Sequence, residues 1–255
     1  MEQLTKTWVA IGDSFTYIDA HVDESGNRIQ KGYLTRTREK LPFKTELINL
    51  GINGGKTREW REVELPKGDF YTILLGTNDW WTGLYKIGDK EDFLQEREEE
   101  IVLGNLGILV RRIKKINPSA KIFIMNPVER GTFVYVFDWT NHALDSTHER
   151  NGVYLKDVSK AIYECARGEN IIPINLHDRL PFTPENVMKF YRVKKDGKLC
   201  DLSFEEFHAD PFSMKMEVYP YPLEAMRYMC DGLHPNDLGY EMIADILAEE
   251  IIKNL

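Results

Sequence analysis

Four short segments of the chain carry the residue types that acyl transfer requires. They contain Ser14, Gly54, Asn78 and, three residues apart, Asp231 and His234. A serine hydroxyl can attack a carbonyl carbon, while a histidine accepts the hydroxyl proton and an aspartate orients the histidine. A glycine amide and a carboxamide can donate hydrogen bonds to the oxyanion that this attack creates. The residue types therefore indicate acyl-transfer chemistry, provided that the fold brings the four segments together.

Short apolar runs precede three of these segments and predict the strands of a parallel sheet. Each run is bounded by Gly, Asn or Pro and is rich in β-branched or aromatic residues. The runs cover residues 7–11, 46–50, 71–75, 121–125 and 170–174. Amphipathic segments separate them, which predicts a three-layer α/β/α sandwich with about five parallel strands. Ser14, Gly54 and Asn78 follow the first three runs, so we expect them at one edge of the sheet.

Three longer segments predict helices that cover the sheet. Residues 92–117 have acidic residues near their beginning and basic residues near their end, which matches the helix dipole. Residues 145–167 form a second candidate helix, with Asp145 as its N-cap. Residues 236–254 form a third, and its apolar stripe is predicted to run through Leu238, Met242 and Ile246.

The four segments resemble the sequence blocks of the GDSL-type, or SGNH, esterases and lipases, and they occur in the family's order. Gly-Asp-Ser-Phe resembles the first block, with Phe15 in place of leucine, and Gly-Thr-Asn-Asp resembles the third. The resemblance covers about residues 5–126 and 229–255. It implies a flavodoxin-like SGNH hydrolase fold and an ester-hydrolysing enzyme without a cofactor.

The resemblance also implies a role for each residue. Ser14 would be the nucleophile, His234 the general base, and Asp231 the residue that orients the histidine. The N–H groups of Ser14 and Gly54, with the side-chain amide of Asn78, would form the oxyanion hole. Taken alone, Ser14 would be interpreted as a helix cap, and the other three segments favour the nucleophile.

Two other patterns are weaker candidates for functional sites. Asp145 and His148 form a second Asp-x-x-His pattern, but it follows no strand directly and precedes no terminal helix. Residues 51–57 end in Gly-Lys-Thr like a phosphate-binding loop, yet Leu50 occupies the position where that motif requires glycine. The remaining histidines lack ligand spacing, so no metal site is predicted.

Trp80 and Trp81 directly follow the Asn78 segment and are predicted to lie near the substrate. An indole there can stack on a sugar ring or line an acyl slot, and the sequence leaves both open. The whole chain, 1–255, is predicted to be one domain with an insertion at about 176–228. Within the insertion we expect a hairpin at 192–199 and a capping box between Ser203 and Glu206. Its dense aromatic residues suit a local core, a pocket wall or a dimer contact.

Composition excludes several classes of protein. The formal net charge of −8 argues against nonspecific binding to nucleic acids or anionic membranes. No apolar run has the length of a membrane span, and residues 1–9 lack the features of a signal peptide, so a cytoplasmic location is expected. Cys165, Cys200 and Cys230 fit neither a disulfide framework nor a zinc site.

The expected function is hydrolysis of a small soluble ester, with an O-acetylated carbohydrate slightly favoured. Thioesterases and acyltransferases use the same apparatus, so these activities remain alternatives. A non-catalytic carbohydrate- or ligand-binding module on the same fold is a further alternative, although no catalytic residue is missing. The sequence leaves the oligomeric state undetermined.

Overall fold

Five parallel strands form the central sheet of the computed structural model, which describes residues 5–96, 100–209 and 217–255. The sheet has the order β2-β1-β3-β4-β7, and all neighbouring pairs are parallel. Its strands are β1 (Lys6–Gly12), β2 (Thr45–Gly51), β3 (Phe70–Leu74), β4 (Lys121–Met125) and β7 (Ile171–Ile174). The predicted three-layer fold and all five predicted strands are confirmed.

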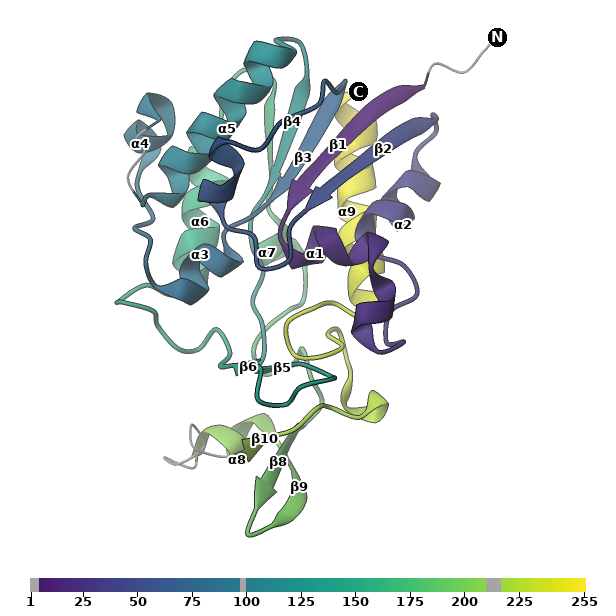
Figure 1. The fold of residues 1–255 in the computed structure, drawn as a ribbon, viewed down its shortest axis with the longest axis vertical. Coiled ribbons are helices and arrows are strands. Elements are labelled where there is room, and N and C mark those ends of the chain that lie inside the picture. Colours follow the sequence, from purple (N-terminus) through teal and green to yellow (C-terminus); the bar gives the residue numbers. More distant parts are fainter. Residues whose placement is uncertain (1–4, 97–99, 210–216) are drawn as a thin grey trace.

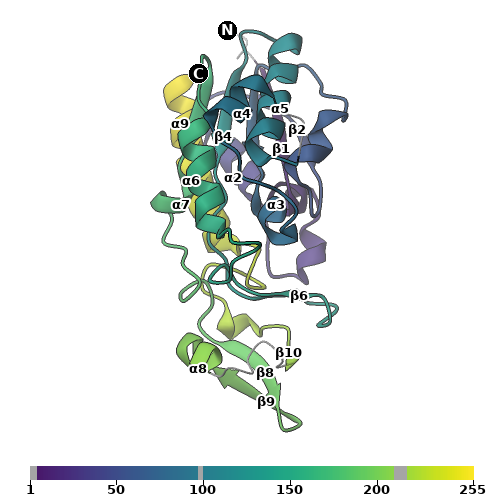
Figure 2. The same ribbon diagram turned by 90° about the vertical axis from the view of Figure 1, so that its left-hand side faces the viewer.

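Helices cover both faces of this sheet (Figures 1 and 2). Side chains of α2, α7 and α9 pack in one buried cluster, and those of α5 and α6 pack in the other. The α-helices are α1 (Ser14–Tyr17), α2 (Tyr33–Lys40), α3 (Thr77–Thr82), α4 (Lys90–Gln95), α5 (Val102–Ile116), α6 (Leu155–Cys165), α7 (Leu176–Arg179), α8 (Phe204–Ala209) and α9 (Asp237–Asn254). Short 3-10 helices cover Ile18–Ala20, Val22–Ser25, Thr57–Arg61 and Leu223–Ala225.

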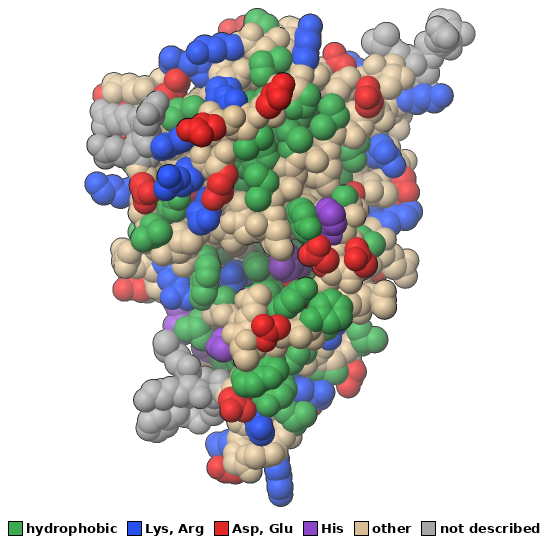
Figure 3. Space-filling model, viewed as in Figure 1, with side chains coloured by type: hydrophobic (Ala, Val, Ile, Leu, Met, Phe, Trp, Pro, Cys, Tyr) green, Lys and Arg blue, Asp and Glu red, His purple; other side chains and the backbone are tan. Residues whose placement is uncertain are grey.

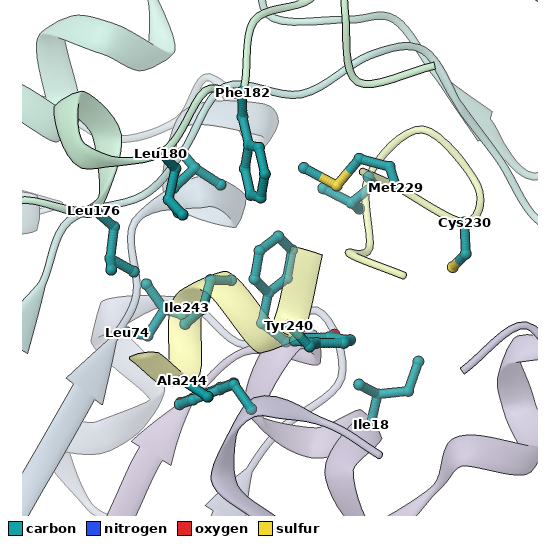
Figure 4. Close-up of a cluster of buried hydrophobic side chains, with 14 of the residues drawn as sticks. Ile18, Leu74, Leu176, Leu180, Phe182, Met229, Cys230, Tyr240, Ile243 and Ala244 are labelled. Carbon is teal, nitrogen blue, oxygen red and sulfur yellow. The ribbon is translucent and has the colours of Figure 1, made fainter. Parts of the chain in front are cut away.

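Helix α9 anchors the last part of the described chain to the sheet. Its predicted limits are confirmed, and Asn236 caps it by accepting a hydrogen bond from the Gly239 N–H. The predicted stripe is wrong at one end, because Leu238 is 53% exposed while Tyr240 is fully buried. Figure 4 shows Tyr240 and Ile243 pointing from the helix into the cluster that contains Phe182 and Leu180.

The predicted helix over residues 92–117 is in fact two helices. Helix α4 ends at Gln95, Glu96 adopts a left-handed φ of 55°, and α5 begins at Val102. Part of the acidic run on which the prediction relied, residues 97–99, lies outside the described residues. Gly107 explains how the chain doubles back: a Cβ atom there would lie 2.1 Å from the Phe93 carbonyl oxygen, so only glycine lets α4 pack this closely on α5.

The predicted helix over residues 145–167 is also shorter than expected. Helix α6 begins at Leu155, because Asn151 and Gly152 both adopt left-handed φ values and form a turn closed by the bridge between Arg150 and Val153. Asp145 is therefore not its N-cap. It is instead a fully buried carboxylate, ten residues before the helix.

The region from 176 to 228 extends beyond the carboxyl ends of the sheet strands (Figure 1). It contains α8 and an antiparallel sheet of β8 (Tyr191–Lys195), β9 (Lys198–Leu202) and β10 (Glu217–Val218). The predicted hairpin and its Asp-Gly turn are confirmed, with Asp196 and Gly197 both at left-handed φ. The predicted capping box is confirmed by reciprocal hydrogen bonds between Ser203 and Glu206.

Aromatic side chains fill the interior of this region. The rings of Tyr191 and Phe207 stack with their centroids 4.6 Å apart, and Tyr221 packs edge-on against Tyr191. These side chains join the buried cluster that also contains α9, so the region is fixed to the sheet domain. Between it and the sheet lies a small ribbon of β5 (Phe133–Val134) and β6 (His142–Ala143). None of the helices in the described ranges combines the length and apolar character needed to cross a bilayer.

Candidate active site

The turn after β1 positions Ser14. The strand ends at Gly12, and Asp13 caps α1 by accepting a hydrogen bond from the Phe15 N–H at 3.0 Å. Ser14 is thus the first residue of α1 and lies at the carboxyl edge of the sheet. It is 7% exposed and lines a cavity. The capping role that Ser14 taken alone would suggest therefore belongs to Asp13, which leaves the Ser14 hydroxyl available.

The loop before α9 brings His234 to this hydroxyl. His234 Nε2 lies 2.8 Å from Ser14 Oγ, and His234 Nδ1 lies 2.7 Å from Asp231 Oδ2. The other carboxylate oxygen, Oδ1, accepts hydrogen bonds from the N–H groups of Leu233 and His234 at 2.9 and 2.7 Å. The three side chains form one hydrogen-bonded chain from hydroxyl to carboxylate.

The segment that contains β5 fixes this loop from outside. Val134 N–H donates to the Asp231 carbonyl at 3.0 Å, and Gly131 N–H donates to the Gly232 carbonyl at 2.8 Å. The Phe133 ring meets the imidazole of His234 edge-on, with the ring centroids 5.7 Å apart. Backbone and side-chain contacts therefore restrict both the loop and the imidazole plane.

Burial and hydrogen bonding shift the pKa values of Asp231 and Asp13, the two aspartates that act on His234, in opposite directions. Burial works against ionisation of Asp231, but the adjacent His234 and the hydrogen bonds to the carboxylate hold its pKa below the ordinary value. Burial raises the pKa of Asp13 to about 7, with the Phe15 N–H and His234 opposing the rise. Asp231 is thus the carboxylate that stays ionised beside the imidazole at neutral pH.

Gly54 and Asn78 line the same cavity as Ser14. Gly54 has a φ of +70°, and a Cβ atom there would meet nothing within 4 Å. Glycine therefore suits the left-handed backbone that this position adopts. The Asn78 amide donates one hydrogen bond to the Gly55 carbonyl at 3.1 Å, which leaves its second N–H for a ligand.

A buried carboxylate below Asn78 holds these two loops together. Asp79 is fully buried and accepts hydrogen bonds from the N–H and hydroxyl of Thr57. Burial raises the pKa of Asp79 to about 6, while the Thr57 donors act against the rise. Thr57, the last residue of the phosphate-loop-like run, is thus committed to a structural contact. Lys56 pairs with Glu59 at 3.1 Å.

A cavity of about 370 Å³ collects the predicted site residues. Ser14, Gly54, Asn78, Asp231 and His234 all line it, as does Trp81. Figure 3 shows a hollow across the middle of the molecule, with histidine and basic side chains visible inside it. The structure separates the two tryptophans. Trp80 is 2% exposed, packs in the core and donates its indole N–H to the Val153 carbonyl at 3.0 Å.

Among the cavity residues that sequence reasoning missed are Arg130, Phe133 and Tyr135. All three come from the segment after β4, which ends at the same edge of the sheet as β1 and β3. Residues that follow parallel strands form the site, and this rule singled out Ser14 and Asn78. The same rule applies to this segment. A charged residue shortly after an apolar strand was the available signal.

The second Asp-x-x-His pattern lies apart from Ser14. Asp145 Oδ2 is 2.9 Å from His208 Nε2 and accepts a hydrogen bond from the Thr132 hydroxyl. His148 Nδ1 lies 3.3 Å from Asp145 Oδ1. Within the described ranges, no group of three or more His, Cys, Asp or Glu side chains is arranged to hold a metal ion.

Known proteins resemble the chain over nearly its whole length. The family model of the GDSL-like lipase/acylhydrolase family matches residues 10–242. The structure of a possible lipase from Chitinophaga pinensis shares 38% identity and a TM-score of 0.89, covering 97% of this chain and 98% of that one. A putative GDSL-like lipase from Parabacteroides merdae shares the fold at 19% identity, with a TM-score of 0.57 and coverage of 98% and 96%.

A protein from Lactobacillus plantarum also shares the fold, at 16% identity and a TM-score of 0.61, with 98% of each chain covered. No curated protein sequence matches the chain. The family model spans most of the chain, including the segments that carry Ser14, Asn78 and His234. This chain therefore belongs to the GDSL-like lipase/acylhydrolase family of hydrolases.

Proposed function

We propose that the protein is a serine ester hydrolase that works through an acyl-enzyme on Ser14. The observation that carries the proposal is the continuous contact from Ser14 Oγ through the imidazole of His234 to Asp231. The ionised Asp231 carboxylate favours the tautomer in which Nδ1 carries the proton. Nε2 is then free to accept the proton of the serine hydroxyl.

The reaction proceeds in two halves. Ser14 Oγ attacks the ester carbonyl, His234 takes the hydroxyl proton, and the imidazolium then protonates the leaving alcohol. Water attacks the acyl-enzyme in the second half, again with His234 as the base. The N–H groups of Ser14 and Gly54 and the free amide N–H of Asn78 stabilise the oxyanion of both tetrahedral intermediates. Each such donor contributes about 3 kcal/mol of transition-state stabilisation.

The cavity favours a small substrate. Its volume of about 370 Å³ holds a short acyl group and a compact alcohol. An O-acetylated carbohydrate remains the candidate suggested by the tryptophans, although Arg150 covers the Trp81 ring at 3.8 Å and so occupies one of its faces. A thioesterase or an acyltransferase would use the same three side chains. A non-catalytic ligand-binding module is disfavoured because the nucleophile, base and orienting carboxylate are all present.

Two measurements, covalent labelling and a comparison of rates, separate these alternatives. The protein is treated with a fluorophosphonate, and the modified residue is identified by peptide mass spectrometry, with exposed Ser119→Ala as the matched serine control. We expect modification of Ser14 in the wild type and the control. Rates are then compared across p-nitrophenyl esters of rising chain length, acetylated sugars and an acetyl thioester, with and without an added alcohol acceptor. No modification of Ser14 and no turnover of any ester would contradict the proposal.

A further inference from the structure

Arg130 places a buried positive charge in the same cavity as Ser14. It follows β4, it is 2% exposed, and it lines the cavity with Asn78 and His234. Burying a guanidinium is costly unless the charge is compensated. Within the described residues, however, no carboxylate lies within ion-pairing distance of Arg130. Backbone carbonyl groups accept its hydrogen bonds, and the negative charges of Asp231 and Asp145 act on it only from a greater distance.

The hydrogen bonds of Arg130 leave one nitrogen available. Nε donates to the Gly131 carbonyl at 3.4 Å, and Nη2 donates to the carbonyls of Ala143 and Leu144 at 3.1 and 3.0 Å. These bonds tie the β6 region to the site and fix the plane of the guanidinium. Among the described residues Nη1 has no acceptor, and it is not one of the fully enclosed unsatisfied atoms. Nη1 therefore belongs to the small exposed part of Arg130, which lines the cavity.

The surroundings keep the guanidinium in place and charged. Its carbon lies 5.1 Å from the Trp81 ring centroid and 5.9 Å from that of Trp80, and a second cation, Arg150, lies 3.8 Å from the Trp81 ring centroid. Burial lowers the pKa of Arg130 to about 10, so it stays protonated at neutral pH. Two positive charges therefore flank one indole beside the site.

The nearest carboxylates are already occupied. Asp231 and Asp145 both act on Arg130 electrostatically. The oxygens of Asp231 accept hydrogen bonds from the His234 ring and two amides, and those of Asp145 accept from His208, Thr132 and Thr147. An anion entering the cavity would give Nη1 the acceptor that the protein does not supply.

We propose that Arg130 binds a carboxylate group of the substrate, so that the enzyme prefers esters that carry a carboxylate in the acyl or the alcohol part. A charge-assisted hydrogen bond from a fixed guanidinium is stronger than one between neutral groups, and it is strengthened where water is excluded. The proposal rests on the ester hydrolysis proposed above and names the substrate class of that same site.

Matched pairs of esters test the proposal. On the alcohol side, meta-acetoxybenzoate is compared with neutral meta-acetoxybenzamide; on the acyl side, phenyl hemiglutarate is compared with neutral phenyl glutaramate. Uncatalysed hydrolysis is subtracted from each rate. We expect the wild type to favour the carboxylate member of at least one pair by about tenfold or more in kcat/KM.

Substitution then locates the preference. Arg130→Gln should abolish the preference, lowering kcat/KM for the carboxylate ester by about tenfold beyond any change in kcat/KM for its neutral counterpart. Arg130→Lys, which keeps the charge without the guanidinium geometry, should retain part of it. Arg38→Gln, which removes an equal charge from the exposed side of α2, should change neither the preference nor the kcat/KM for the neutral ester. Equal losses for charged and neutral esters in Arg130→Gln would overturn the proposal and assign Arg130 to general positioning of the site.

A measurement on the wild type keeps the proposal testable even when Arg130→Gln does not fold. meta-Hydroxybenzoate and glutarate are compared as competitive inhibitors with meta-hydroxybenzamide and glutaramate, in each of which an amide replaces one carboxylate. Stronger inhibition by a carboxylate, weakened by added salt, supports the proposal. Absence of preference in both substrate pairs and in inhibition would overturn it, while hydrolysis of the neutral esters would still uphold the proposed function. Failure to hydrolyse any of the four esters would count against the proposed function itself.

Discussion

Two segments of this chain share the pattern Asp-x-x-His and begin with the same turn. In one, Asp231 Oδ1 accepts a hydrogen bond from the N–H of Leu233 at 2.9 Å; in the other, Asp145 Oδ1 accepts from the N–H of Thr147 at 3.0 Å. Both carboxylates are buried. Burial opposes ionisation of each, yet hydrogen bonds and a histidine hold the pKa of each below its ordinary value.

The two segments differ in what their second carboxylate oxygen meets. Asp231 Oδ2 contacts His234 of its own segment, whose far nitrogen reaches Ser14. Asp145 Oδ2 contacts His208 of α8 and the hydroxyl of Thr132, so it joins the 176–228 region to the sheet domain. A local pattern therefore creates an oriented carboxylate, and the element packed opposite decides whether that carboxylate serves chemistry or assembly.

The largest expected effect is on turnover in the first segment. Ser14→Ala and His234→Ala should each lower kcat for a short aryl ester by a factor on the order of 10⁴ or more, because each removes a group that handles the transferred proton. His148→Ala is the matched control from the second segment and should keep nearly full turnover. Steady-state kinetics on folded variants, checked by circular dichroism, measures this. An inactive His148→Ala variant would reverse the two roles.

The second prediction exchanges each aspartate for its amide. Asp231→Asn should remain folded and lose kcat by a factor on the order of 10³, because the amide no longer favours the tautomer with the proton on Nδ1. Asp145→Asn should keep kcat within about threefold of the wild-type value. Comparison of kcat at matched fractions of folded protein separates the cases. Similar loss of kcat in both variants would mean that the second segment also acts on the site.

The third prediction concerns stability. Asp145→Asn should lower the free energy of unfolding by about 2 kcal/mol, because it removes a charged acceptor from His208. Burial lowers the pKa of His208, but the bond to Asp145 outweighs this and raises it above 6.5, whereas Asp145 titrates below 3.8. The stabilisation that protonated His208 gives the folded state is therefore complete below pH 6.5. It is lost as the pH rises through the higher pKa that His208 has in the folded state.

Urea unfolding of the wild type and Asp145→Asn between pH 5 and 9 checks this window. The difference in unfolding free energy should be large at the acid end of the range and shrink toward the alkaline end. His208→Gln should reproduce the pattern. A difference that grows with pH would contradict the assignment of the pair.

The smallest expected effect is that of metal removal. The oxygens of Asp145 are satisfied by protein donors, and no metal-binding group is found among the described residues. Dialysis against EDTA should therefore change neither the midpoint of thermal unfolding nor the rate of ester hydrolysis. A drop in the unfolding midpoint that zinc restores would show that His148 and His208 hold a metal with Asp145.

The sequence predicted the sheet well because its signals are local. The five strands are short buried runs, and the residues after them lie at the sheet edge by topology alone, which is why the segments of Ser14 and Asn78 could be found. Predictions about helices missed a local turn at Asn151 and Gly152, and they also missed contacts between segments. The break at Glu96 depends on α4 packing against Gly107, and Asp145 is buried because His208 approaches it from 63 residues away.

The same limit explains what the site analysis missed. Arg130 and Phe133 belong to a segment whose backbone hydrogen bonds reach the loop of Asp231 and Gly232, far along the chain. Trp80 and Trp81 are neighbours in sequence, but the turn of α3 sends one indole into the core and the other to the cavity. Adjacent residues on a short helix face different directions, and composition carries no information on which one meets solvent.

The separation of 220 residues between Ser14 and His234 has a consequence for biosynthesis. Translation at about 5–20 residues per second delivers the serine roughly 10–45 s before its base. Under the proposed mechanism, the nascent chain has throughout that interval a nucleophile and parts of an oxyanion hole, but no group to take the proton. Activity therefore begins only when α9 docks and carries the histidine into place.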